Sequence, residues 1–542
     1  MVKNTSGKIE VSMIVLLACI PLFIHLPYRV NIFLSWEGAY RMSKGQLPFR
    51  DFGIPLGGMY WVIPAIFFKL FGARMVTLVK AQVLINVIAG LSFRSILKSL
   101  AVDKGVRLAS VLLFCISYSF FNFWPWYNHS VIMYELAALA CLCRYLRTDM
   151  DGGRHHWPWL VGAGILAVCS FLTKQDGGGL GFMIACTLLA VYGLFRRKWR
   201  PLLIFVASFA VTLVLIILPF LKYGFGYWFN HGQPPHTARV SVFDVAEEFF
   251  AASQWIKFYL FVICVLAMIR WRNRETLLAD QKSVMLTVLT LGLLGEAAIF
   301  QVTSYTPPDN NIFFHSFGFA CVFSLLGGAA VNFAKPRSAL LLSAGVILWW
   351  SGTWWKYTER FAGKIMPHHE ERVSPTGENV VNRQTYMINT DTSEQSKDIP
   401  TEQWVECGLP SFDRITMPKP TVEGIHRLLE MDVVKKPGIH VLNMSELTPL
   451  AAEIPFELES NPQLPLWYHL GVGMFNRQAD SFGVRIRQQY YDLVLFEHIP
   501  TLNNFYPFRL QDSLRLHYRQ VDSFLAPRRG PETRGYIEVY VR

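Results

Sequence analysis

The chain has 542 residues, of which 52% are hydrophobic and only 17% are charged, with a mean hydropathy of +0.28. A soluble domain is about 25% charged, so this composition excludes an all-soluble protein and predicts a polytopic α-helical membrane protein with soluble mass attached. Residues 1–355 hold 30 Lys and Arg against 15 Asp and Glu, whereas residues 356–542 hold 21 against 24. Because a nucleic-acid protein carries its basic excess on a soluble face, this distribution excludes a nucleic-acid partner and indicates loop charges that set topology in the bilayer.

Eleven apolar segments are long enough to cross a bilayer, which takes about 20 residues. They are 11–29, 75–97, 108–123, 130–146, 158–173, 180–195, 201–221, 254–270, 284–303, 313–333 and 338–355. We therefore predict a bundle of about 11 transmembrane helices within residues 1–355. The odd number of spans places the two termini on opposite sides of the membrane.

Basic residues fix the orientation of these spans. With the N-terminus in the cytoplasm, every loop on the inner side is basic, as in residues 98–107, 196–200 and 270–282. The short loops on the outer side hold one Lys between them. This orientation places outside the first outer loop (30–74), a second long loop (222–253) and the whole C-terminal tail.

The first outer loop contains one further apolar run, at residues 55–72 (PLGGMYWVIPAIFFKLFG). The run is short and has Pro64 in its middle, and counting it as a span would invert the basic pattern of every later loop. It is therefore predicted to form an interfacial or re-entrant helix. In the second outer loop, the stretch around Phe243 and Phe249 is likewise predicted to be a helix on the membrane surface.

The tail, residues 356–542, has ordinary charge and no spanning segment. Residues 421–431 have the pattern of a helix, and residues 440–444, 491–499 and 535–542 have the pattern of strands. Eight of the nine Cys lie in apolar stretches, all but Cys407, which excludes a disulfide framework in the tail. We expect a small extracytoplasmic domain of the α/β or α+β class.

Glu37 and Asp51 are the leading candidates for acid–base chemistry. They stand in the first outer loop together with Arg41 and Arg50. A glycosyl transfer needs a carboxylate to take the proton of the acceptor and cations to neutralise a leaving phosphate, and this loop offers both. The structural alternative is that Glu37 caps a short surface helix and that Asp51 only pairs with Arg50.

The segment Thr173-Lys174-Gln175-Asp176-Gly177 lies at the outer end of the fifth predicted span. A Lys beside glycines suits a phosphate, although the order of a P-loop is absent. The alternative is a helix terminus with an interfacial Lys.

Acids are rare inside the predicted spans, and such residues tend to be functional. Glu135 and Glu296 both lie toward the outer side, the same side as Asp176, and His129 lies in an aromatic corner nearby. We name these four residues as a possible wall of a site; each acid could instead be a buried acid paired with a neighbouring side chain. His231 and His236 match no strong metal spacing, so no metal site is predicted, and metal dependence stays open.

Two motifs resemble a known family. The string S-W-E-G-A-Y at 35–40, followed by G-Q-L-P-F-R-D-F-G-I-P-L-G-G at 45–58, resembles the first outer loop of the GT-C glycosyltransferase superfamily. That superfamily includes protein O-mannosyltransferases and aminoarabinose transferases of lipid A. The T-K-Q-D-G segment at 173–177 resembles a K-Q-x-G motif of the same superfamily. The resemblance covers residues 10–355 and leaves out the tail.

The resemblance implies an inverting glycosyltransferase that takes its sugar from a polyprenyl phosphate at the outer face. Glu37 falls on the acidic motif and Asp51 on the R-D-F aspartate. Trp36 stands where many relatives have an Asp, which leaves open whether Glu37, Asp51 or both act as the base. Lys174 falls on the K-Q lysine.

The donor phosphate is expected to be held by basic and polar groups of the outer loops, namely Arg41, Arg50, Lys174, Gln175 and Arg239. The acceptor is a glycan, a lipid or a protein, and the tail would bind it or cover the groove. The predicted location is a bacterial inner membrane, with the endoplasmic reticulum as the alternative. The competing functions are a transporter or flippase of lipid-linked sugars and a non-catalytic membrane scaffold.

Overall fold

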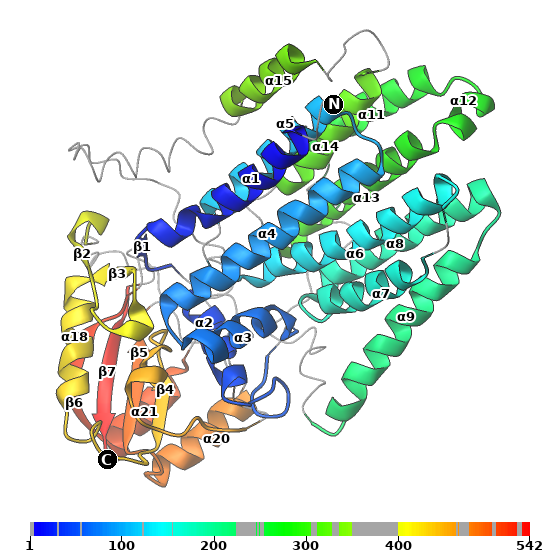
Figure 1. Cartoon of the computed structure of the whole chain (residues 1–542). Helices are drawn as coiled ribbons and strands as arrows, with labels where there is room; N and C mark the ends of the chain where they lie inside the picture. Colours follow the sequence, from blue (N-terminus) through cyan, green and yellow to red (C-terminus); the bar gives the residue numbers. More distant parts are fainter. Residues whose placement is uncertain are drawn as a thin grey trace.

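The computed structural model describes residues 5–29, 32–54, 57–121, 124–153, 156–223, 245, 249, 254–304, 312–327, 335–349, 399–461, 464, 476–500, 506–527 and 534–542. Long helices form a bundle, and the C-terminal domain packs against one end of it (Figure 1). The helices α2 and α3 lie at that end, between the bundle and the domain (Figure 1).

Each of the eleven predicted spans overlaps a helix, with bounds that differ at the ends. The helices are α1 (Thr5–Cys19), α4 (Met75–Ser99), α5 (Lys104–Phe121), α6 (Tyr127–Met150), α7 (Pro158–Phe171), α8 (Gln175–Arg196), α9 (Arg200–Ile217), α11 (Gln254–Arg270), α13 (Gln281–Ser304), α14 (Ile312–Leu326) and α15 (Pro336–Trp349). The short helices η1 (Ile20–Phe23) and η3 (Leu218–Phe220) follow α1 and α9, and α12 (Arg274–Ala279) joins α11 to α13.

Within the described residues, six helical stretches are long and apolar enough to cross a membrane. They are Ser6–Phe23, Met75–Ser99, Tyr127–Met150, Gln175–Arg196, Arg200–Phe220 and Gln281–Thr303. The chain is therefore a multi-pass membrane protein, while the total of eleven spans stays a prediction.

The first predicted span, 11–29, is wrong at its C-terminal end. The helical part ends at Phe23, and the strand β1 (Leu26–Pro27) follows it. The amides of Leu26 and Tyr28 donate to the carbonyls of Arg414 and Thr416 in the C-terminal domain, at 2.9 Å each. Because these donors are used by a strand partner, the stretch is extended and joins the domain to the bundle.

The first outer loop contains the helices α2 (Ile32–Ser43), η2 (Met59–Trp61) and α3 (Val62–Phe71). α2 is buried along most of its length. α3 buries Ala65 and Phe68 but exposes Ile66, Leu70 and Phe71. An exposed apolar face on a short helix is what an interfacial helix presents to lipid, which agrees with the sequence-based expectation. Nearly all of the second outer loop, including its expected surface helix, lies outside the described residues.

The C-terminal domain is mixed α and β. Its elements are η6 (Thr401–Gln403), β2 (Trp404–Glu406), η7 (Pro410–Phe412), β3 (Ile415–Pro418), α18 (Lys419–Glu430), β4 (Val441–Met444), α19 (Leu450–Glu453), α20 (Asn476–Arg487), β5 (Leu493–His498), α21 (Phe508–His517), β6 (Arg519–Leu525) and β7 (Tyr536–Val541). One sheet has the order β4-β5-β7-β6, with only the β4–β5 pair parallel. The predicted helix and all three predicted strands are present, whereas β2, β3, β6, α20 and α21 were not expected.

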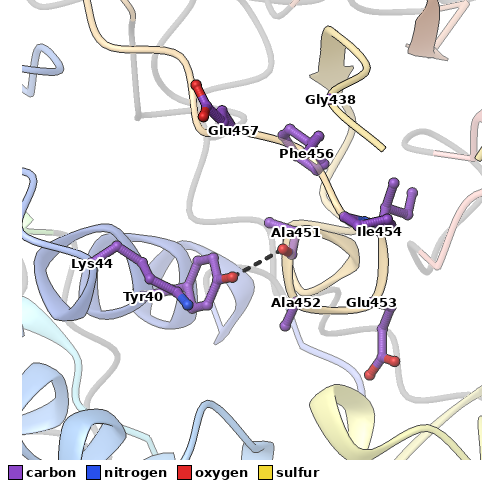
Figure 2. A pocket seen from close by; sticks show the side chains of 10 residues that line it. Tyr40, Lys44, Gly438, Ala451, Ala452, Glu453, Ile454, Phe456 and Glu457 are labelled. Atoms are coloured by element: carbon purple, nitrogen blue, oxygen red, sulfur yellow. Dashed lines mark hydrogen bonds between the residues drawn. The ribbon is translucent and has the colours of Figure 1, made fainter. Parts of the chain in front are cut away.

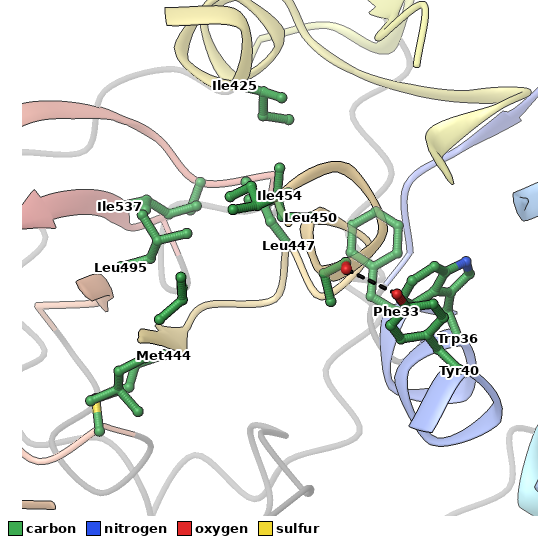
Figure 3. Close-up of a cluster of buried hydrophobic side chains, with 14 of the residues drawn as sticks. Phe33, Trp36, Tyr40, Ile425, Met444, Leu447, Leu450, Ile454, Leu495 and Ile537 are labelled. Atoms are coloured by element: carbon green, nitrogen blue, oxygen red, sulfur yellow. Dashed lines mark hydrogen bonds between the residues drawn. The ribbon is translucent and has the colours of Figure 1, made fainter. Parts of the chain in front are cut away.

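The domain and the first outer loop share one hydrophobic core. Phe33, Trp36 and Tyr40 of α2 belong to the same buried cluster as Leu450 and Ile454 of the domain (Figure 3). A second sheet, of order β1-β3-β2, also crosses from the N-terminal part to the domain. The division predicted at residue 355 stays a prediction, because residues 350–398 lie outside the described chain.

Charged residues of the predicted inner loops meet one another at the far end of the bundle. Glu10 receives hydrogen bonds from Arg94 at 2.6 Å and from Arg107 at 3.0 Å. Lys282 donates to Asp151 at 2.6 Å. The N-terminal end of the described chain lies at this end, away from the C-terminal domain (Figure 1). The candidate site residues therefore gather at one end of the bundle and the basic loops at the other.

Candidate active site

Glu37 lies in the middle of α2, which begins at Ile32, so the helix-cap alternative is wrong. Arg41, one turn later on the same face, donates from Nε to Oε1 of Glu37 at 2.9 Å. Oε2 of Glu37 is buried and meets no hydrogen-bond donor among the described residues. Burial raises the pKa of Glu37, although the Arg41 charge and hydrogen bond lower it. Arg41 therefore holds one carboxylate oxygen of Glu37, and the other accepts no hydrogen bond from the described residues.

Both carboxylate oxygens of Asp51 are occupied by other groups. Oδ2 accepts from the Leu47 amide at 2.7 Å and from Arg50 Nε at 2.8 Å, and Oδ1 accepts from the Ser460 hydroxyl at 2.8 Å. The Asp51 carbonyl also accepts from the Asn461 amide at 2.7 Å. Burial would raise the pKa of Asp51, but the hydrogen bonds from Arg50, Leu47 and Ser460 outweigh it and lower the pKa. Asp51 therefore joins the first outer loop to the C-terminal domain.

The two arginines of the loop are also engaged with the protein. Arg41 is buried and donates further to Gln46 at 2.9 Å and to the Glu459 carbonyl at 3.0 Å. Arg50 pairs with Asp51 at 2.6 Å and keeps 37% of its side chain exposed. The expected pairing of Asp51 with Arg50 is thus present, and Arg50 is the more accessible of the two cations.

Lys174 directly precedes α8 and is buried, with 6% of its surface exposed. Its Nζ lies 3.0 Å from Asp176, whose Oδ2 also accepts from the Thr303 hydroxyl at 2.6 Å. The ammonium lies over the rings of Phe300 and Tyr127, at 4.7 and 5.9 Å from their centroids. Burial excludes the alternative of a Lys exposed at the membrane interface. Gln175 begins α8, and the glycines that follow belong to that helix rather than to a phosphate loop.

Glycines bring the first outer loop against the segment that carries Lys174. A Cβ added at Gly57 would lie 1.4 Å from the Leu172 carbonyl oxygen, so only Gly fits there. The Met59 amide donates to the same carbonyl at 3.3 Å. The end of the motif at residues 35–58 thus contacts Leu172, the residue that directly precedes the motif at 173–177.

A chain of aromatic contacts connects the helix that carries Glu37 with Lys174. Gly38, next to Glu37, packs on the indole of Trp61 so closely that a Cβ would lie 1.9 Å from it. Trp61 contacts Tyr60, whose ring meets Tyr127 at 6.1 Å, and the Lys174 ammonium lies over the ring of Tyr127. The two candidate groups therefore belong to one packed aromatic assembly.

Glu135 on α6 and Glu296 on α13 are buried and interact with each other. Apart from each other, their carboxyl groups meet no hydrogen-bond partner among the described residues. Glu296 is also close enough to Lys174 and Asp176 for electrostatic interaction. Their expected partner, a neighbouring basic or hydroxyl side chain, is replaced by a second acid. His129 on α6 packs edge-on against Trp126 at 5.4 Å.

Sequence reasoning missed two groups of residues around the site. Glu459 and Ser460 reach it from the C-terminal domain, and no local pattern could indicate a contact with residues about 400 positions earlier. Tyr60 and Trp61 fall in the run 55–72, which was predicted only to form an interfacial or re-entrant helix. Arg239, His231 and His236 lie outside the described residues. Within those residues, no group of three or more His, Cys, Asp or Glu side chains is arranged to hold a metal ion.

No protein-family model and no curated protein matches the sequence. Among solved structures, the chain is similar to ArnT from Cupriavidus metallidurans bound to undecaprenyl phosphate, at 12% identity and a TM-score of 0.44, over 99% of this chain and 98% of that one. ArnT in the apo state gives 11% identity and a TM-score of 0.46, over 98% and 97%. The arabinofuranosyltransferase AftD from mycobacteria gives 12% identity and a TM-score of 0.48, over 98% of this chain and 39% of AftD.

Proposed function

We propose that this chain is a membrane glycosyltransferase that moves a sugar from a polyprenyl phosphate to an acceptor hydroxyl at the outer face of a bacterial inner membrane. The supporting observation is the state of Glu37. Arg41 fixes one of its oxygens, the other is vacant, and burial raises its pKa toward the working range of a general base. Asp51 is the weaker candidate, because its two oxygens are already occupied and its pKa is lowered.

In the proposed reaction, Oε2 of Glu37 takes the proton of the acceptor hydroxyl. The acceptor oxygen attacks the anomeric carbon from the face opposite the phosphate, which inverts that carbon. The bond between the anomeric carbon and the phosphate oxygen breaks, and the electron pair leaves with polyprenyl phosphate.

Lys174 is proposed to neutralise the leaving phosphate. Asp176 holds the Lys174 ammonium at 3.0 Å, and an ammonium carries three donors with which it can bind phosphate oxygens. A cation buried in a water-poor site stabilises developing negative charge more strongly than one in water. Gln175 and Arg239 remain proposed phosphate contacts, whereas Arg41 is now proposed to orient Glu37 and Arg50 to hold Asp51. The N-terminus is proposed to be cytoplasmic and the C-terminal domain periplasmic.

The test is release of labelled sugar from a panel of undecaprenyl-phosphate sugars by purified protein in nanodiscs. We expect release by the wild type and a loss of about 10²–10⁴-fold in Glu37→Gln, the usual contribution of a general base. Asp51→Asn is the matched control, because it also replaces one carboxylate of the same loop by an amide.

Three results would redirect the proposal. Release that survives Glu37→Gln but is lost in Asp51→Asn would move the base to Asp51. Release that survives both changes would place the base elsewhere. Absence of release from every donor, by protein that still binds undecaprenyl phosphate, would favour the transporter, and a flipping assay in proteoliposomes would then decide.

A further inference from the structure

A cavity of about 460 Å³ lies where α2 meets the C-terminal domain. Its polar and aromatic lining comes from Tyr40 on α2, from Lys44 directly after that helix, and from Glu453, Phe456 and Glu457 on the domain (Figure 2). The Tyr40 hydroxyl donates to the Ala451 carbonyl at 3.0 Å and closes one side of the cavity (Figure 2). The volume is within the range of roughly 300–1,000 Å³ that small-molecule sites occupy.

The cavity is on the same helix face as the candidate base. Glu37, Tyr40, Arg41 and Lys44 follow the spacing i, i+3, i+4 and i+7, which places them along one side of α2. At about 1.5 Å per residue, Lys44 lies roughly 10 Å along the helix axis from Glu37. A ligand held in the cavity would therefore have one end within a short reach of Glu37.

The lining suits a ligand rich in hydroxyl groups. The Lys44 ammonium donates, the carboxylate of Glu457 accepts, and a hydroxyl can satisfy both kinds of partner. Oε1 of Glu453 already accepts from the Ser411 amide at 3.0 Å, so Glu453 offers its other oxygen. Tyr40 and Phe456 add flat apolar surfaces. Ala452 and Glu457 are exposed, so the cavity is open to solvent.

Two features argue against other acceptors. Among the described residues, none that lines the cavity belongs to a membrane-spanning helix, which argues against an acyl chain as its ligand. An extended peptide binds by adding a strand to a free sheet edge. Here the backbone at Phe456 is already bridged to Ile439, and residues 450–453 are helical.

We propose that this cavity binds a carbohydrate portion of the acceptor, adjacent to the unit whose hydroxyl reacts at Glu37. The proposal rests on the proposed glycosyl transfer for its biological meaning, but the binding itself can be tested without catalysis. The C-terminal domain then supplies acceptor recognition, while the first outer loop supplies the chemistry.

The test is direct binding of a panel of trisaccharides, namely maltotriose, chitotriose and an arabinan trisaccharide, measured by saturation-transfer NMR on the full chain in nanodiscs. We expect at least one of them to bind the wild type and Glu37→Gln alike. Ala452→Trp, which fills the cavity, should abolish binding, and Lys44→Ala should weaken it about tenfold. Leu516→Trp is the matched control, because Leu516 is an 81% exposed residue of the same domain that does not line the cavity.

Binding that is unchanged in both Ala452→Trp and Lys44→Ala would overturn the proposal, as would absence of binding by every trisaccharide. Phe456→Ala replaces Ala452→Trp if the larger side chain prevents folding. If a serine-rich peptide binds instead and is displaced by Ala452→Trp, the acceptor is a protein and the carbohydrate assignment is wrong. Loss of transfer in Glu37→Gln with trisaccharide binding intact separates failure of the chemistry from failure of this site.

Discussion

Arg41 donates to one carboxylate oxygen of Glu37 at 2.9 Å, and the other oxygen of Glu37 meets no donor among the described residues. Burial raises the pKa of this carboxyl group, while Arg41 lowers it. Two opposing effects therefore set the pKa of Glu37, and a substitution of Arg41 removes the one that lowers it.

Replacing Arg41 by Met should move the acid limb of the pH profile of kcat/KM to higher pH. A base works only when deprotonated, so activity falls as the pH drops through the pKa of Glu37. Loss of a neighbouring cation raises that pKa, and an opposite charge at this range is worth about 1–3 pH units. The profile is measured by sugar transfer across a pH series, with Arg41→Lys as the control that keeps the charge. A limb that stays in place or moves to lower pH would show that Glu37 is not the titrating base.

Asp51 and Ser460 should be coupled in stability. Their hydrogen bond of 2.8 Å joins the first outer loop to the C-terminal domain, and a hydrogen bond to a charged group contributes about 1.5–3 kcal/mol. Asp51→Asn and Ser460→Ala should each lower the thermal unfolding temperature, and the double variant should lose less than the sum of the two. Additive losses would mean that the contact contributes nothing.

The contribution of Asp51 to the stability of the fold depends on pH. The pKa of Asp51 is lowered in the folded protein, so its contribution to stability is present above the ordinary Asp pKa and is lost as the pH falls through the lowered value. The difference in unfolding temperature between wild type and Asp51→Asn should therefore be constant near neutral pH and shrink under acid conditions.

Lys174 and Asp176 form a buried ion pair at 3.0 Å, and their two possible roles can be separated. Asp176→Leu alone removes the ion-pair partner of a buried cation and should cost about 3–5 kcal/mol of stability. The double variant Lys174→Met with Asp176→Leu removes both charges and should recover most of that stability. If Lys174 also holds the donor phosphate, the double variant should regain its fold but not sugar release or binding of undecaprenyl phosphate. Recovery of release in the double variant would limit Lys174 to a structural role.

The sequence alone predicted the helices well because their signal is local. Each predicted span overlaps a helix. A run of about 20 apolar residues in lipid forms a helix because only then are its backbone N–H and C=O groups hydrogen-bonded within the segment. The end of the first span was misplaced for a non-local reason. Leu26 and Pro27 are apolar and continue the run, but their strand partner, Ile415 and Thr416, lies nearly 400 residues away.

The sequence predicted which residues belong to the candidate site, but not which hydrogen bonds they make. Glu37, Asp51 and Lys174 were each named from residue type and resemblance. The difference between Glu37 and Asp51 could not be predicted, because Oδ1 of Asp51 accepts from Ser460, a residue of the distant C-terminal domain. Oε2 of Glu37, in contrast, meets no donor among the described residues. Residue type gives a carboxylate; only packing decides whether its oxygens are already used.

Glu135 and Glu296 present the opposite situation, in which two buried carboxyl groups interact with each other and meet no other hydrogen-bond partner among the described residues. Two carboxyl groups that share a buried site do not both ionise, so one keeps its proton and donates to the other. Glu296→Gln keeps the shape of the side chain and an N–H donor toward Glu135, so it should change the thermal unfolding temperature little near neutral pH. Glu296→Ala, the control, removes the donor and leaves a cavity, so it should lower that temperature. A decrease in Glu296→Gln as large as that in Glu296→Ala would contradict this interpretation, because it would mean that the carboxyl group itself is required at this position.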